Sequence, residues 1–170
     1  ARYTSPSQTP LGSSADSISG GGGNNVLIES SDAASIVLVD NKLTITETGG
    51  ADTEDTLSGI TKAQITGGTS ENTIDASGFN AGPVILYSGG GTDTLKGTSK
   101  DDLFVVDVSN LSGSEKVTVD PGAGAGDRVV IQGLTSSTVT QDDFNWINWS
   151  GSTANYTLNK DTIKLGSNIT

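Results

Sequence analysis

The residues best placed to do chemistry are two aspartates nine positions apart in the segment 88–105, which reads SGGGTDTLKGTSKDDLFV. Divided into units of nine, the segment puts Asp93 and Asp102 sixth in their units, and Leu95 and Phe104 eighth. Glycines permit the positive φ of a tight turn and leave backbone carbonyls open to a cation, while a carboxylate completes the shell of oxygen ligands. The spacing therefore favours an oxygen-ligated cation at each turn.

The composition narrows the choice of cation. The chain has no histidine, cysteine or methionine, which excludes thiolate zinc sites, Ser-His-Asp catalysis and haem ligation by the usual residues. Oxygen ligands remain, and these suit calcium. Twenty acidic residues against nine basic ones give a net charge of −11, which argues against nucleic acid or an anionic membrane as a partner. No apolar run approaches the roughly 18 residues of a membrane span, so we expect no membrane insertion.

Short β-strands are the elements that must position these turns. The chain has 23 glycines in 170 residues and is rich in Ser, Thr, Asn and Asp, which favours many strands joined by tight turns. Leu43 and Ile45 alternate with Thr44 and Thr46, a pattern typical of a strand with one buried face. Helical spacing is not sustained anywhere, apart from one turn expected near 140–144. Strands are predicted at 26–30, 35–40, 42–48, 63–67, 72–77, 83–88, 102–108, 116–120, 128–133, 154–158 and 161–166.

The nine-residue units resemble the RTX, or haemolysin-type, calcium-binding repeats, whose pattern is G-G-x-G-x-D-x-U-x with U apolar. The unit 88–96 departs from it only at Ser88, and the unit 97–105 keeps Gly97, Asp102 and Phe104. The segments 126–144 and 161–170 are similar to the region that follows such repeats in secreted bacterial proteins. Weaker copies of the unit lie at 20–28, 67–75 and 122–130.

The resemblance implies calcium sites at Asp93 and Asp102, with backbone carbonyls from Gly89 and Gly91. Each side chain also has a simpler interpretation, in which Asp or Asn caps a turn by accepting hydrogen bonds from nearby amides. The sequence leaves both interpretations open. Further candidate ligands are Asn72, Asp75, Asp101 and Asp127.

The fold predicted from the repeats is all-β: a right-handed parallel β-helix or β-roll, a solenoid with irregular turns. Such a fold tolerates uneven spacing because insertions enter the loops while the strands keep stacking. We expect residues 20–170 to form this RTX-like domain. Residues 1–19, which contain Pro6, Pro10 and a serine-rich run, are predicted to form an extended arm or linker.

These features predict a secreted, calcium-binding structural protein, a self-assembling subunit of an extracellular fibre, biofilm matrix or surface layer. The expected partners are copies of the chain, joined end to end or by strand addition, and cell-surface polysaccharide. We expect no enzymatic activity, because Arg128 and the lysines form no cluster in the sequence. An alternative is the C-terminal RTX region of a larger secreted hydrolase or adhesin. The segment 144–150 brings Phe144, Trp146 and Trp149 close together, either as a local hydrophobic plug or as a carbohydrate-stacking surface.

Overall fold

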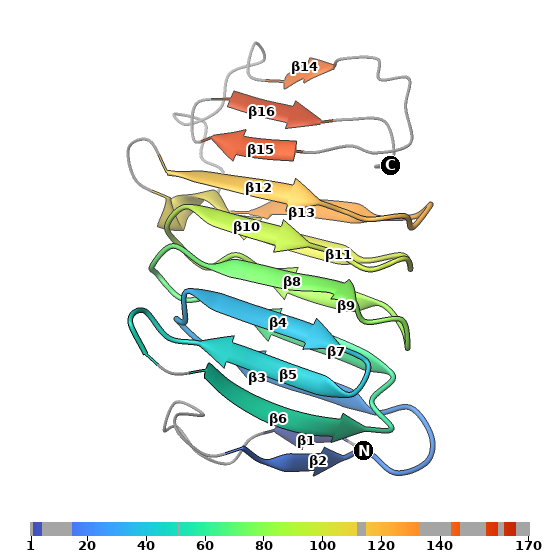
Figure 1. The fold of residues 1–170 in the computed structure, drawn as a ribbon. Coiled ribbons are helices and arrows are strands. Elements are labelled where there is room, and N and C mark those ends of the chain that lie inside the picture. Colours follow the sequence, from blue (N-terminus) through green and yellow to red (C-terminus); the bar gives the residue numbers. More distant parts are fainter. Residues whose placement is uncertain are drawn as a thin grey trace.

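The fold consists of two β-sheets with the hydrophobic core between them (Figure 1). The computed structural model describes residues 2–4, 15–50, 52–111, 115–132, 144–146, 156–159 and 162–165, and side chains only within 15–132. Among the described residues the helical structure is one short 3-10 turn, Val108–Asn110. No helix in these ranges is long and apolar enough to cross a bilayer.

The first sheet has six strands, and every described pair of neighbouring strands in it is parallel. Its strands alternate in the sequence with those of the other sheet, which is why none of its neighbours is joined by a hairpin. In spatial order they are β1 (Arg2–Thr4), β3 (Val26–Ser30), β7 (Lys62–Thr66), β9 (Val84–Tyr87), β11 (Leu103–Asp107) and β13 (Arg128–Gln132).

The second sheet has ten strands and is mixed. Its parallel central part is flanked by antiparallel neighbours: β5 pairs antiparallel with β4 and β6, and β15 pairs antiparallel with β12 and β16. In spatial order the strands are β14 (Phe144–Trp146), β16 (Thr162–Leu165), β15 (Tyr156–Asn159), β12 (Lys116–Asp120), β10 (Asp93–Lys96), β8 (Thr73–Gly78), β4 (Ser35–Val39), β5 (Lys42–Thr46), β6 (Asp52–Ser58) and β2 (Ser17–Ser19).

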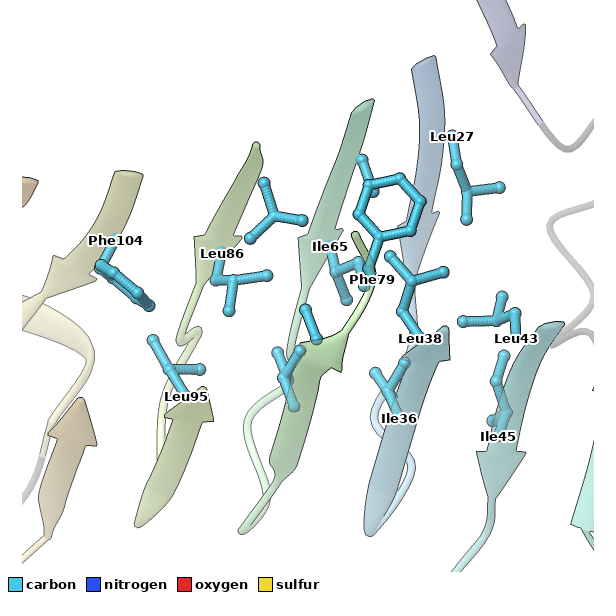
Figure 2. Packing of buried hydrophobic residues seen from close by; sticks show 14 of the residues in the cluster. Leu27, Ile36, Leu38, Leu43, Ile45, Ile65, Phe79, Leu86, Leu95 and Phe104 are labelled. Atoms are coloured by element: carbon cyan, nitrogen blue, oxygen red, sulfur yellow. The ribbon is translucent and has the colours of Figure 1, made fainter. Parts of the chain in front are cut away.

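The core is built from alternate residues of strands in both sheets. Because successive side chains in a strand point to opposite faces, every second residue enters the space between the sheets. Figure 2 shows Leu86 and Phe104 of the six-stranded sheet directed into this space, together with Leu95 of the ten-stranded sheet. All three are fully buried. The eighth residues of the two nine-residue units, Leu95 and Phe104, therefore both point into the core.

The predicted right-handed parallel β-helix or β-roll is wrong. The structure has one parallel and one mixed sheet, and the antiparallel strands β5, β6, β15 and β16 are incompatible with the predicted solenoid. One cause of the antiparallel pairing is the tight connection at Asp40 and Asn41 between β4 and β5, because Asp and Asn tolerate the conformations that a hairpin turn requires. The prediction also missed β6. Its sequence, DTEDTLS, contains few apolar residues, so no strand was predicted there.

The eleven predicted strands each overlap an observed one, which confirms the alternation pattern as a local signal. Within the predicted arm, β1 and β2 pair with β3 and β6, and Ile18 of β2 is buried. The division of the chain at residue 20 stays a prediction. The helical turn expected near 140–144 lies outside the described residues except for Phe144, which begins β14.

Candidate functional site

The glycine-containing turns lie at the two long edges where the chain passes between the sheets. We call the edge where it passes from the six-stranded to the ten-stranded sheet the first edge, at the left of Figure 1, and the opposite one the second edge. Asp93 follows a turn of the first edge and begins β10, whereas Asp102 follows a turn of the second edge and precedes β11. The nine-residue spacing therefore places the two aspartates on opposite edges.

At the first edge, Asp93 and Asn72 connect successive turns. The backbone N–H of Asn72 donates to Oδ1 of Asp93 at 2.9 Å. The Asn72 side chain in turn accepts from the N–H of Gly68 at 2.8 Å and donates to the carbonyl of Ala33 at 2.7 Å. Both side chains are almost completely buried. Asn72 therefore caps its own turn and also binds the preceding one, whereas Asp93 fixes the backbone of the preceding turn.

At the second edge, Asp102 and Asp127 repeat this arrangement. Oδ1 of Asp102 accepts from the N–H of Val84 at 2.8 Å, and its Oδ2 accepts from the N–H of Thr98 at 2.6 Å. The Thr98 hydroxyl lies 3.0 Å from the same Oδ2. Oδ1 of Asp127 accepts from the N–H of Asp102 at 2.8 Å. Capping of turns is therefore one role of these residues, and both oxygens of Asp102 are occupied by it.

Three buried oxygen atoms in these turns have no hydrogen-bond partner: Oδ2 of Asp93, Oδ2 of Asp127 and Oγ of Ser88. Asp93 is 1% exposed, and Asp127 and Ser88 are 0% exposed. A buried polar atom without a partner costs about 1–3 kcal/mol, and more when it is charged. Two of the three atoms belong to the same turn, 88–93. A hydrogen-bond donor or a cation at this turn would therefore satisfy the largest number of buried oxygens.

Burial also perturbs the acidity of these carboxyl groups. Burial raises the pKa of Asp93 to about 7, against the lowering effect of the Asn72 amide, and the nearby charges of Glu115, Asp32 and Glu71 raise it further. Burial is likewise the main cause that raises the pKa values of Asp102 and Asp127. A cation close to these groups would favour their charged forms and reverse the effect.

Gly89 and Gly91 are required by the close stacking of turns at the first edge. Their φ angles are 84° and 90°, in the left-handed region that side chains rarely adopt. A Cβ at Gly89 would lie 2.1 Å from the carbonyl oxygen of Gly68, and one at Gly91 would lie 2.5 Å from that of Ser70. The predicted role of their own carbonyls as cation ligands stays a prediction.

The two remaining predicted ligands, Asp101 and Asp75, lie in different parts of the structure. Asp101 is exposed, accepts from the N–H of Gly126 at 2.9 Å and lies close enough to raise the pKa of Asp102 and Asp127. Asp75 lies instead on the outer face of β8, where it forms a 2.8 Å ion pair with Lys96. Within the described ranges, no three Asp or Glu side chains converge in a manner that would hold a metal ion. An ion at these turns would have to use backbone carbonyls or water as well.

Sequence reasoning did not identify two acidic side chains that point inward between the sheets. Glu29 lies on the same face of β3 as Leu27, and Asp55 lies on the same face of β6 as Leu57. Burial raises the pKa of Glu29 to about 7, and the charge of Asp55 raises it further. The period-two pattern of 26–30 contained this signal, because Glu29 falls on the buried positions of that strand.

Comparison with known proteins adds no assignment to this geometry. No protein-family model matches the chain, and neither a curated protein nor a solved structure matches it significantly.

Proposed function

We propose that this chain is a secreted, calcium-stabilised structural protein that assembles with copies of itself in an extracellular matrix or at a cell surface. The observation that carries the proposal is the pair of buried carboxylate oxygens without partners, Oδ2 of Asp93 and Oδ2 of Asp127. Both follow glycine-containing turns in a chain of net charge −11. A calcium ion at such a turn supplies the missing partner and offsets part of the repulsion among carboxylates.

The turn 88–93 fits the chemistry of calcium best. Calcium takes about six to eight oxygen ligands, and this turn offers a carboxylate oxygen, the Ser88 hydroxyl and backbone carbonyls. Asp127 offers a second free carboxylate oxygen at the other edge. Asp102 is the weakest candidate of the three, since amide and hydroxyl donors occupy both of its oxygens. We therefore assign the proposed ions to Asp93 and Asp127 first.

The arrangement of strands supports the assembly part of the proposal. In the order of described strands, the six-stranded sheet ends at β1 on one side and at β13 on the other. Backbone groups at a sheet edge can pair with a strand of another chain. All described pairs of neighbouring strands in this sheet are parallel, so a strand added parallel to β13 continues the same ladder.

Calcium-dependent stability tests the proposal directly. Thermal unfolding is followed at pH 7.5 in chelator, in 10 mM calcium and in 10 mM magnesium. For a site with a Kd on the order of 10⁻⁴ M, typical of extracellular modules, 10 mM calcium stabilises the fold by about 2.7 kcal/mol. We expect a rise in Tm with calcium and a smaller one with magnesium. An identical Tm in all three buffers contradicts calcium stabilisation.

Assembly is measured separately, by sedimentation velocity and negative-stain microscopy of the same samples over a range of protein concentrations. We expect larger species to form as the concentration rises, and to dissociate when calcium is chelated. If the chain binds calcium but stays monomeric at every concentration, this result supports the calcium site and refutes the proposed role as an assembling subunit.

A further inference from the structure

Both sheets divide at the same point of the sequence. In the six-stranded sheet β1, β3 and β7 are neighbours, and β9, β11 and β13 follow on one side of them. In the ten-stranded sheet β2, β6, β5, β4 and β8 are neighbours, and the later strands follow from β10 onward. We call β1–β8 the N-terminal block and β9–β16 the C-terminal block. They are the lower and the upper part of the fold in Figure 1.

The buried oxygens without a hydrogen-bond partner lie in one block only. Ser88, Asp93 and Asp127, which carry these atoms, all belong to the C-terminal block. Within the described residues 15–50 and 52–78 of the N-terminal block, every completely buried side-chain oxygen or nitrogen atom has a partner. The groups that a cation would satisfy are therefore confined to the C-terminal block.

In the N-terminal block, a side-chain amide fills a turn that is rich in carbonyl oxygens. Nδ2 of Asn25 donates to the carbonyl of Gly59 at 2.8 Å, and it lies 3.3 Å and 3.4 Å from the carbonyl oxygens of Gly21 and Gly23. Gly59 begins the adjacent turn, so the amide also joins two turns. Asn25 is 2% exposed. Carbonyl oxygens around one buried point are ligands that calcium also uses, but a neutral amide already satisfies them here.

The same turn conformation recurs in the C-terminal block with a carboxylate in place of the amide. The glycines four and two residues before Asn25 have φ angles of 70° and 93°. Gly89 and Gly91, which stand four and two residues before Asp93, have φ angles of 84° and 90°. A carboxylate oxygen cannot donate a hydrogen bond. Only a proton or a cation can therefore do for Oδ2 of Asp93 what the amide hydrogens do at Asn25.

The residue type at these turns matches the backbone group that the adjacent turn presents. Asn72 donates to the carbonyl of Ala33 at 2.7 Å, as Asn25 does to that of Gly59. Asp102 instead accepts from the N–H of Val84 at 2.8 Å, and the other aspartates at the ends of turns in the C-terminal block likewise accept from an N–H. The asparagines thus join turns without a buried charge.

Two buried acidic residues of the N-terminal block do not alter this division. Glu29 and Asp55 lie within β3 and β6 rather than in turns, and Oδ1 of Asp55 accepts from the N–H of Asp16 at 2.9 Å. The N-terminal block also has its own part of the core, in which Leu38, Leu43 and Ile65 are fully buried. It can therefore stay closed when the neighbouring strands open, as separate units of one fold commonly do.

We infer that the calcium response is confined to the C-terminal block, and that the N-terminal block stays folded when calcium is removed. This inference rests on the proposed calcium stabilisation and specifies which part of the chain responds to the ion. Side-chain amides close the turns of the first block, whereas the second block depends on an ion at its free carboxylate oxygens. Calcium then controls local order in one half of the fold.

The test is hydrogen exchange of the wild type at pH 7.5, in chelator and in 10 mM calcium, measured separately for peptides of the two blocks. For a Kd on the order of 10⁻⁴ M, removal of calcium should lower the protection of β10, β11 and β12 by up to about 100-fold. The protection of β3, β5 and β7 should stay unchanged. An equal loss in both blocks keeps calcium stabilisation and overturns the division. No loss in either block contradicts calcium stabilisation itself, and the inference with it.

A pair of variants tests the role of the amide. Asn25→Asp places a carboxylate among three carbonyl oxygens, and the matched control Asn24→Asp makes the same change at the exposed neighbouring position. In chelator, we expect Asn25→Asp to lower the protection of β3 and β7 by about tenfold or more, and Asn24→Asp to leave it unchanged. Wild-type protection in Asn25→Asp refutes the inference, because the amide then does not close the turn. If circular dichroism shows that Asn25→Asp is unfolded, the wild-type exchange data decide alone.

Discussion

Replacement of Asp93 by asparagine is expected to raise stability in the absence of calcium and to reduce the stabilisation that calcium provides. The asparagine Oδ1 can still accept from the N–H of Asn72, so the cap of the turn is kept while the buried charge is removed. Without calcium, wild type keeps a carboxylate whose pKa burial raises from 3.8 to about 7. At 1.36 kcal/mol per pH unit, full ionisation of this group destabilises the fold by about 4 kcal/mol above pH 7.

The sign of the pH dependence follows from the same values. Between pH 3.8 and about 7 the folded protein binds the Asp93 proton more tightly than the unfolded chain does, so this group makes stability fall as the pH rises through that window. Below the window both states are protonated and the contribution vanishes. In chelator, Asp93→Asn is therefore expected to exceed wild type in stability at pH 8 and to match it near pH 3.5.

The assay is urea unfolding at several pH values, in chelator and in 10 mM calcium. Calcium should raise the free energy of unfolding of wild type and have a smaller effect on Asp93→Asn. The control Asp40→Asn makes the same chemical change at an exposed carboxylate, whose pKa is lowered mainly by the backbone N–H of Asn80. It should lose a little stability at neutral pH and keep the full calcium response. The reasoning is refuted if Asp93→Asn gains nothing in chelator at pH 8 and retains the wild-type calcium response.

Three further variants test other parts of the structure. Gly89→Ala should destabilise the fold by more than about 1 kcal/mol in urea unfolding, because of its positive φ and the lack of space for a Cβ, whereas Gly22→Ala, with open space around it, should be nearly neutral. Glu29→Gln should raise stability at pH 8 by about 3 kcal/mol and flatten the decline between pH 4.5 and 7; an unchanged pH profile would contradict its buried, protonated state. Lys96→Ala should cost less than about 1 kcal/mol, since its ion pair with Asp75 is partly exposed, and a double-mutant cycle measures the coupling.

The local elements of the fold were largely predictable, and their assembly was not. Alternation such as that of Leu43 and Ile45 with their threonine neighbours depends only on the chain within one strand, so strand positions followed from the sequence. The direction in which β5 and β6 pair depends on contacts among three strands. In addition, Asp55 of β6 is buried, whereas the hydrophobic pattern assigns an aspartate to solvent, so the pattern did not predict β6. The predicted solenoid was wrong for this reason.

The sequence predicted the types of residue that form the candidate site, but not which of these residues contact one another. Asp93 contacts Asn72 across 21 positions of sequence, and Asp102 contacts Asp127 across 25. The spacing of a single repeat contains no information about which amide of the preceding turn a carboxylate reaches. The same limit applies to Asp75, which was predicted as a ligand. Asp75 lies within β8 and not in a turn, and the repeat spacing alone did not indicate this.

The two aspartates nine positions apart, Asp93 and Asp102, differ in how many of their oxygens have a partner, and their turns begin with different residues. At Gly97 a Cβ would lie 2.7 Å from Oδ2 of Asp102, so the glycine leaves room for that oxygen to reach the N–H of Thr98. The equivalent position before Asp93 is Ser88, which has the Cβ that Gly97 lacks. Oδ2 of Asp93 and Oγ of Ser88 are both left without a partner. In the unit 88–96 the one departure from the repeat pattern therefore coincides with an aspartate oxygen that is free to bind an ion, whereas Asp102 uses both of its oxygens to fix backbone amides.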